Sequence, residues 1–162
     1  MSETNLAAQL SALILNQQHL TTGLKSLLEQ EQQLLLENDS VQMMSVIQQK
    51  EDLAQQMATT QNQLNTLAQQ YNQAEPEQRL VKLIQAVDPT GQLLQQWETL
   101  LDGAKACKQL NETNGATINL KKRYADNGLA ILRGQTGNRN STTYSKKGVE
   151  TRKQGSHILH KA

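Results

Sequence analysis

The side chains that could act as catalysts in this 162-residue chain do not form a catalytic set. Glu29 and Glu31 lie two residues apart, so they project from different sides of a helix, and we expect both to be solvated. His157 and His160 have a spacing that could share a metal on a helix, but two ligands are too few for a site. Cys107 lies among apolar residues and is expected to be a small buried hydrophobe. The sequence therefore predicts no enzyme, no metal site and no cofactor.

Two amide side chains on the last predicted helix are expected to form hydrogen bonds that matter for packing or for binding. Asn111 and Asn114 fall on the side of that helix which its apolar pattern predicts to be buried. A buried amide without a partner costs about 1 to 3 kcal/mol, so both should hydrogen-bond across the helices or face a binding partner. In the first case they fix the register of the helices, as an Asn at a core heptad position does. In the second they are binding residues, and both interpretations stay open.

The elements that carry these residues are predicted to be long, thin helices. With 2% aromatic residues and no Phe, the chain cannot build a thick core of interlocked rings. Its apolar content is mostly Leu, and a strict seven-residue spacing, typical of a coiled coil, joins Leu6, Leu13, Leu20, Leu27, Leu34 and Val41. A second row alternates apolar with polar residues at Leu10, Gln17, Leu24 and Glu31. The first helix must therefore pack against a partner helix.

A short polar interruption at residues 38–40 contains three good N-cap residues, which favours an antiparallel helical hairpin. The second helix is predicted over residues 41–71, with one stripe formed by Met43, Ile47, Ala54, Met57, Leu64, Ala68 and Tyr71. Lys50 falls on the same stripe, so this core should be looser. Pro76 is expected at the start of a short helix that ends at Val87.

The last helix is predicted to start at the pair Asp88-Pro89, with Pro at the first helical position, and to continue toward Leu132. Its predicted stripe contains Leu93, Trp97, Leu100, Ala104, Cys107, Asn111, Asn114 and Ile118. The fold class is therefore all-α: an antiparallel coiled-coil hairpin with a long C-terminal helix and a flexible basic tail.

The charge of the chain changes sign near Lys121. Of 15 acidic and 16 basic residues, 13 acids and 6 bases precede this position, whereas 2 acids and 10 bases lie from it onward. The net charge of +1 thus combines two opposite parts, as expected of a folded scaffold with an interaction segment. From residue 134 the chain is rich in turn formers and poor in apolar residues. We expect a helical domain over 1–133 and a flexible basic interaction tail over 134–162.

The expected location is the cytoplasm, without direct insertion into a membrane. No stretch approaches the roughly 20 apolar residues that span a bilayer, and the first residues do not form a signal peptide. A single Cys permits no disulfide within the chain. The sequence leaves monomer and homodimer both open.

Several of these residues together resemble a known family. The pattern consists of Asn111-x-x-Asn114-Gly115 followed by Ile118, then Leu129-Ala130-Ile131-Leu132, then Thr143-Tyr144 and Gly148 in a basic tail. It resembles the FlgN family of flagellar type III export chaperones, and the order of the predicted elements agrees. The resemblance covers essentially the whole chain, with its specific part in the last third.

The resemblance implies a cytoplasmic chaperone that binds the C-terminal regions of the hook-associated proteins FlgK and FlgL. It also implies that the chaperone prevents their premature assembly and delivers them to the export gate protein FlhA. The substrate-binding residues it implies are Asn111, Asn114, Ile118, Leu129, Ile131 and Leu132. A Tyr in the tail contributes to gate docking and corresponds to Tyr144, beside Lys146 and Lys147, whose charges would speed association with an acidic surface.

Two alternatives belong to other functional classes. A coiled-coil scaffold without an export role would explain the heptads but not Tyr144. A nonspecific nucleic-acid-associated protein would explain the basic tail. The sequence disfavours nucleic acid as a partner, because only Tyr124 and Tyr144 could stack on bases and no reader motif accompanies them.

Overall fold

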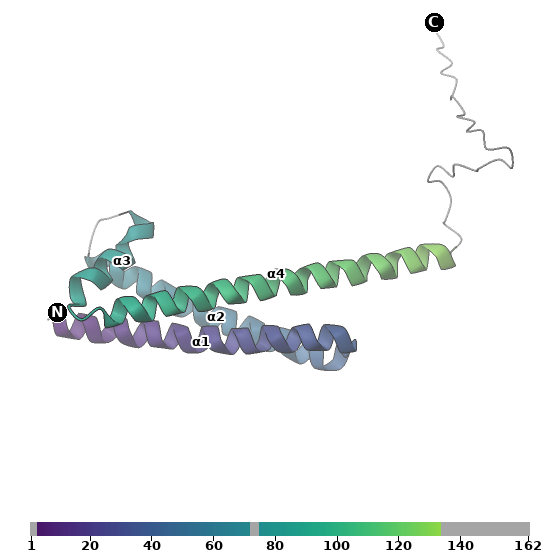
Figure 1. Cartoon of the computed structure of the whole chain (residues 1–162), viewed down its shortest axis with the longest axis horizontal. Coiled ribbons are helices and arrows are strands. Elements are labelled where there is room, and N and C mark those ends of the chain that lie inside the picture. Colours follow the sequence, from purple (N-terminus) through teal and green to yellow (C-terminus); the bar gives the residue numbers. More distant parts are fainter. Residues whose placement is uncertain (1–2, 72–74, 134–162) are drawn as a thin grey trace, which may run out of the picture. The chain divides into compact units, whose positions relative to one another are not determined.

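The computed structural model describes residues 3–71 and 75–133, and within these ranges it contains four α-helices and no strand (Figure 1). They are α1 (Glu3–Glu37), α2 (Ser40–Tyr71), α3 (Pro76–Val87) and α4 (Gln92–Leu132). The predicted all-α fold, with a helical hairpin and a long last helix, is confirmed. The tail predicted over 134–162 lies outside the described residues.

The turn between α1 and α2 is built by Asn38 and Asp39. Asn38 has a φ of 59°, in the left-handed region that Asn tolerates, and the Asp39 N–H donates to the Leu34 carbonyl at 3.3 Å. This bond closes the end of α1 as in a Schellman motif. The Asp39 carboxylate then accepts from the backbone N–H groups of Val41 and Gln42 at 3.1 and 3.0 Å. Of the three predicted cap residues, Asp39 is therefore the one that caps α2.

Helix α1 lies between an antiparallel and a parallel neighbour. Asn16 bonds Thr60, and Glu31 bonds Lys50, so residue numbers fall along α2 as they rise along α1. Along α4 they rise together: the side chains of α4 residues 107 and 114 bond the backbone carbonyls of α1 residues 21 and 28. The buried face of α1 is correspondingly wide. It includes a third row that the sequence did not reveal, Ile14, Thr21, Leu28 and Leu35, beside the two predicted rows.

The buried stripe of α2 differs from the predicted one. Ile47, Ala54 and Tyr71 are exposed, whereas the buried residues are Val46, Thr60, Leu64, Leu67 and Ala68. Apolar residues occur in adjacent pairs in α2, so the sequence pattern alone allows either residue of a pair to be buried. Packing against the partner helix determines which one is buried. Leu53 packs opposite Gly23 of α1, where an added Cβ would lie 3.4 Å from a Leu53 methyl group.

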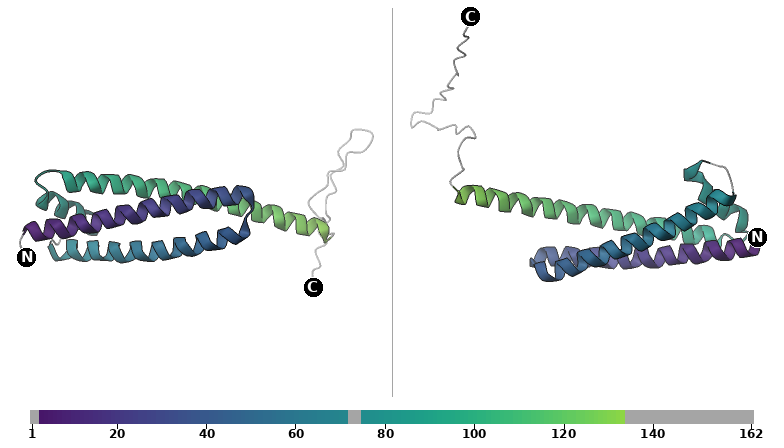
Figure 2. Two further views of the ribbon diagram at one scale, coloured as in Figure 1. Left: turned by 90° about the horizontal axis from the view of Figure 1, so that it is seen from below. Right: turned by 180° about the vertical axis from the view of Figure 1, so that it is seen from behind.

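The main apolar core lies at the end of the hairpin where α3 joins it (Figure 2). Leu80, Leu83, Ile84 and Val87 of α3 pack there with residues of the other three helices: Leu6, Leu10, Ile14, Leu64, Leu67, Ala68 and Leu93. Trp97 packs against this cluster and is half-buried. Pro76 occupies the first turn of α3, as predicted. The short helix α3 thus adds apolar core at one end of the hairpin.

The predicted start of the last helix is wrong. Pro89 lies in a turn, Gly91 has a φ of 76°, and α4 begins at Gln92. Asp88 still acts as a cap, because its carboxylate accepts from the Leu94 backbone N–H and from the Thr90 hydroxyl, both at 3.0 Å. Desolvation acts to raise the pKa of Asp88, but these bonds, with those from residues 91 and 93, together lower it.

Residues up to Lys122 form one compact unit, and those from Arg123 onward belong to a second. Helix α4 contributes to both units. The domain boundary expected after residue 133 stays a prediction.

Candidate functional site

A buried polar layer connects three helices near the C-terminal end of α1. The Lys50 ammonium group of α2 donates to both carboxylate oxygens of Glu31 at 2.9 and 2.8 Å. The Asn114 amide of α4 donates to the same carboxylate at 2.9 Å and to the Leu28 carbonyl at 2.8 Å. The Glu31 side chain is only 5% exposed and that of Lys50 21%. One carboxylate of α1 therefore holds both neighbouring helices.

This layer fixes the register more strongly than the apolar rows do. Apolar heptad rows tolerate a shift of seven residues, but a shifted helix would leave the Glu31 charge buried without its partners, which is costly. The Asn114 amide oxygen has no hydrogen-bond partner among the described residues, so the layer is not fully satisfied even in this register. The predicted burial of Asn114 is confirmed. Of the two interpretations left open for it, its bonds across the helices support a role in register.

Two predictions about polar residues are wrong. Glu31 was expected on the solvated surface, but it is buried because its heptad row on α1 faces the neighbouring helices. Asn111 was expected on the buried side of α4 and is exposed, while Leu110 beside it is half-buried. The signal that could have revealed Glu31 is Lys50, a cation on an apolar stripe that requires a buried acid opposite.

The contact row of α4 becomes more polar along the helix. Leu93, Leu100, Cys107 and Asn114 are buried at intervals of seven residues, and Lys121, one interval further, donates to the Asn38 side chain in the hairpin turn. The Cys107 thiol lies 3.5 Å from the Thr21 carbonyl, and burial raises its pKa. The predicted burial of Cys107 is confirmed.

The other predicted substrate-binding residue of the first unit, Ile118, lies near the end of this row. It was expected on the buried stripe of α4, but its side chain is 44% exposed, and Leu120 nearby is 42% exposed. The first unit therefore presents apolar surface on α4 beyond its last buried residue, Asn114.

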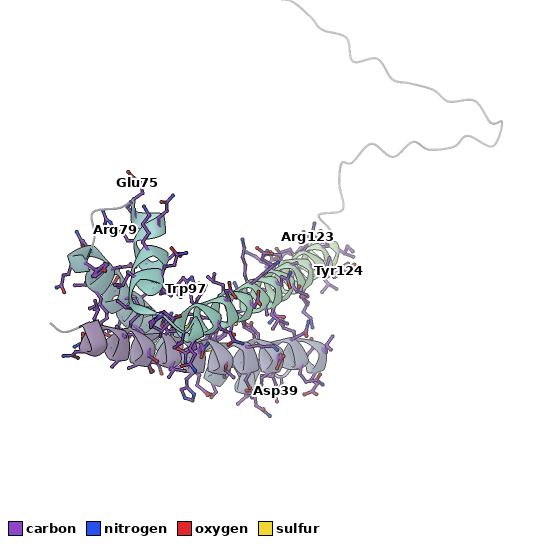
Figure 3. All side chains as sticks on the ribbon, turned by 60° about the vertical axis from the view of Figure 1, so that its left-hand side comes forward. Asp39, Glu75, Arg79, Trp97, Arg123 and Tyr124 are labelled. Carbon is purple, nitrogen blue, oxygen red and sulfur yellow. The ribbon has the colours of Figure 1, made fainter. Side chains whose placement is uncertain are left out.

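The described part of the second unit is an amphipathic helical segment. Tyr124, Leu129, Ile131 and Leu132 are exposed by 68, 47, 63 and 84%. At about 100° per residue they fall within an arc of roughly 160°, completed by Ala125 and Gly128. Arg123, Asp126 and Asn127 occupy the other side. Figure 3 shows the side chains of Arg123 and Tyr124 projecting from α4.

Other predicted features either lie outside the described residues or have no counterpart in them. Tyr144, Lys146 and Lys147 fall in the range 134–162, which the structure does not describe. No cluster of His, Cys, Asp and Glu that could hold a metal ion occurs in the part of the chain that it does describe. No helix there is long and apolar enough to cross a membrane.

Comparison with known proteins identifies a family. A family model described as FlgN protein matches residues 1–152. The matched range contains all four helices and includes Tyr144, Lys146 and Lys147. No curated protein and no solved structure matches the chain.

Proposed function

This chain belongs to the FlgN family of flagellar export chaperones, and we propose that in the cytoplasm it binds the C-terminal regions of the hook-associated proteins FlgK and FlgL. In this proposal it prevents their premature assembly and delivers them to the export gate protein FlhA. No nucleotide is required, because binding by itself lowers the concentration of free, assembly-prone substrate.

The exposed apolar side chains of α4 from Tyr124 to Leu132 carry this proposal. A helix with an exposed apolar side suits a substrate that is itself an amphipathic helix, since packing the two buries both apolar sides. Leu129, Ile131 and Leu132 supply the contacts in the second unit, and Ile118 supplies apolar surface in the first. Among the polar residues, Asn111 is exposed and available for hydrogen bonds to substrate. Asn114 is buried, and its contribution is to hold α4 in register.

Gate docking is assigned to Tyr144, with Lys146 and Lys147 beside it. A Tyr supplies a large apolar contact at a low cost in side-chain entropy, whereas the flanking cations mainly speed association with an acidic surface. Substituting Tyr144 should weaken binding to the FlhA cytoplasmic domain at every salt concentration. Substituting the two Lys residues should weaken it mainly at low salt.

The test of substrate binding is calorimetry with purified FlgK and FlgL. The variant Ile131→Asp/Leu132→Asp places two charges on the apolar face and should abolish binding. The control Asn119→Asp/Asn127→Asp adds the same charge at exposed polar positions of α4 and should bind as the unsubstituted chain does. Circular dichroism and Trp97 fluorescence would verify that both variants are folded. Unchanged affinity in a folded Ile131→Asp/Leu132→Asp variant would refute the placement of the site.

A further inference from the structure

Helix α4 carries two neighbouring rows of residues at seven-residue spacing, and only one of them is buried throughout. The buried row consists of Leu93, Leu100, Cys107 and Asn114. The second row, which the sequence predicted to be buried as well, consists of Trp97, Ala104, Asn111 and Ile118. Trp97 is half-buried against the main core, whereas the other three residues are exposed. Ala104, Asn111 and Ile118 are together called the open row.

The pattern of α4 is that of a helix with two neighbours. Helix α1, which packs along two long helices, has a correspondingly wide buried face. Helix α4 has half-buried residues on one side of its buried row, at Gly103, Leu110 and Thr117. The open row lies on the other side of the buried row, where a second neighbouring helix would pack in a coiled-coil arrangement.

Gly115 lies beside the open row, four residues after Asn111 and three before Ile118. A Gly in the middle of a helix is less favourable than Ala, because it loses more backbone entropy on folding. The fold of the first unit does not require this Gly, since a Cβ added there would meet no atom within 4 Å. At Gly103, by contrast, an added Cβ would lie 3.1 Å from the Thr21 methyl group. Gly103 therefore serves the packing of α4 on α1, whereas the space at Gly115 is open.

A helix that packed on the open row would come closest to α4 at Gly115. The distance between two packed helices depends on the side chains at their contact, so a residue without a side chain permits a close approach. Ala104 is also small, and Ile118 would supply the apolar contact. Asn111 would pair with a polar side chain of the partner and set its register, as an Asn at a core heptad position does.

The charges beside the open row define the flanks of the partner. Lys108 and Lys122 lie seven residues before and after Gly115, so they project from the same side of α4. Both are exposed, and the contact of Lys108 with Glu112, at 4.0 Å, is loose. The matching partner is therefore a helix with small and apolar residues in its centre and acidic residues toward its ends.

We propose that a helix in the C-terminal region of FlgK or FlgL packs along the open row, with its closest approach to the α4 backbone at Gly115. This inference rests on the proposed function and deepens it, because it gives Gly115 a role in specificity. Only a substrate helix with a small residue at the crossing point, such as Gly, Ala or Ser, fits against Gly115. A larger residue at that point holds the two helices apart and prevents the contact with Ile118.

The first test is calorimetry of the full-length Gly115→Leu variant with purified FlgK and FlgL. The Leu side chain fills the space that the substrate backbone needs, and overfilling a packed contact should lower the affinity about 5- to 140-fold. The control Thr113→Leu adds the same side chain at an exposed position about 160° around the helix and should bind normally. Unchanged affinity in a Gly115→Leu variant whose circular dichroism shows it folded would overturn the proposal.

The variant Gly115→Ala separates a contact with substrate from an effect on the fold or on helix stiffness. Its urea midpoint should equal or exceed that of the unsubstituted chain, because Ala favours the helix and its Cβ meets no atom. Its affinity for substrate should nevertheless fall. Thr113→Ala also favours the helix but adds no atom beside the open row, so its affinity should not change. A lower urea midpoint for Gly115→Ala, or an equal loss of affinity in both Ala variants, would contradict the proposal.

The same measurements distinguish this inference from the proposed function. If FlgK and FlgL do not bind the unsubstituted chain, the proposed function fails, and this inference fails with it. If they bind the unsubstituted chain and Gly115→Leu equally well, only the close approach at Gly115 fails. A second copy of the chain is the alternative occupant of the open row. If Gly115→Leu lowers the mass of the free protein in sedimentation equilibrium but leaves substrate affinity unchanged, that copy occupies the row and the proposal is overturned.

Discussion

Replacing Lys50 with Met should reveal how strongly the buried polar layer holds the three helices together. Met is similar in length to Lys but carries no charge, so Lys50→Met removes the partner of a carboxylate that is only 5% exposed. Breaking a buried ion pair from one side costs about 3 to 5 kcal/mol. Because Lys50 is partly exposed and Asn114 still donates to Glu31, we expect the lower part of this range, about 3 kcal/mol.

The double variant Glu31→Leu/Lys50→Met, in contrast, should be nearly as stable as the unsubstituted chain. An apolar replacement of a whole buried pair is often neutral or stabilising, since no charge remains to be desolvated. Asn114 would lose one acceptor but retain the Leu28 carbonyl. The free energy of unfolding of the double variant should therefore lie within about 1 kcal/mol of that of the unsubstituted chain. It should be clearly higher than that of Lys50→Met alone.

Urea unfolding is the appropriate measurement, with Trp97 fluorescence and circular dichroism as two probes. Trp97 is the only Trp and packs against the main core, so its emission reports that core, while circular dichroism reports all helices. Coincident transitions would justify two-state free energies. If the free energy of unfolding of Lys50→Met lies within about 0.5 kcal/mol of that of the unsubstituted chain, the predicted loss of stability is refuted. Such a result would mean that the Glu31 charge is not desolvated in the folded state.

Three further predictions concern the core, the α4 cap and the buried thiol. Leu20→Ala should lower the free energy of unfolding by about 2 to 5 kcal/mol, because Leu20 is buried, whereas the same change at the exposed Leu15 should have little effect in the same assay. Asp88 has a lowered pKa in the fold, so its contribution to stability is present above its unfolded pKa and is lost as the pH falls through the folded value. The melting temperature of the unsubstituted chain should accordingly exceed that of Asp88→Asn at neutral pH, with the gap closing in acid; a gap that is constant down to about pH 2 would contradict the capping role. Cys107 should react with Ellman's reagent far more slowly in the native protein than in urea, and equal rates would show that the thiol is not shielded by α1.

The helices were predictable from the sequence because their ends have local chemical causes. Asp39 caps α2, Pro76 opens α3, and the long stretches between them contain no breaker. The start of α4 was misplaced because Asp88-Pro89 has the composition of a helix start, while the positive φ of Gly91 delays the helix to Gln92. A rule based on residue type could not distinguish these two arrangements.

The contacts between helices were less predictable, because they depend on how many neighbours each helix has. A single heptad row indicates one partner, but α1 packs along two long helices and against α3 at one end. Its buried rows include the polar residues Gln17 and Glu31. The choice of Val46 over Ile47 in α2 follows from this arrangement, because the two side chains are similarly hydrophobic. In the buried polar layer, the burial of Asn114 was predicted correctly, but that of its acidic partner Glu31 was not.

The increasing polarity of the α4 contact row has a consequence for how this helix opens. Each step from Leu100 to Cys107 and Asn114 removes apolar contact with α1, so the local free energy of opening should fall along the helix. Amide hydrogens near Leu93 should then exchange only through global unfolding, whereas those near Ile118 should exchange through fraying that leaves the hairpin intact. Helix α4 is therefore held stably near Leu93 and only weakly near Ile118. Opening of α4 near Ile118 should therefore leave the core around Leu93 folded.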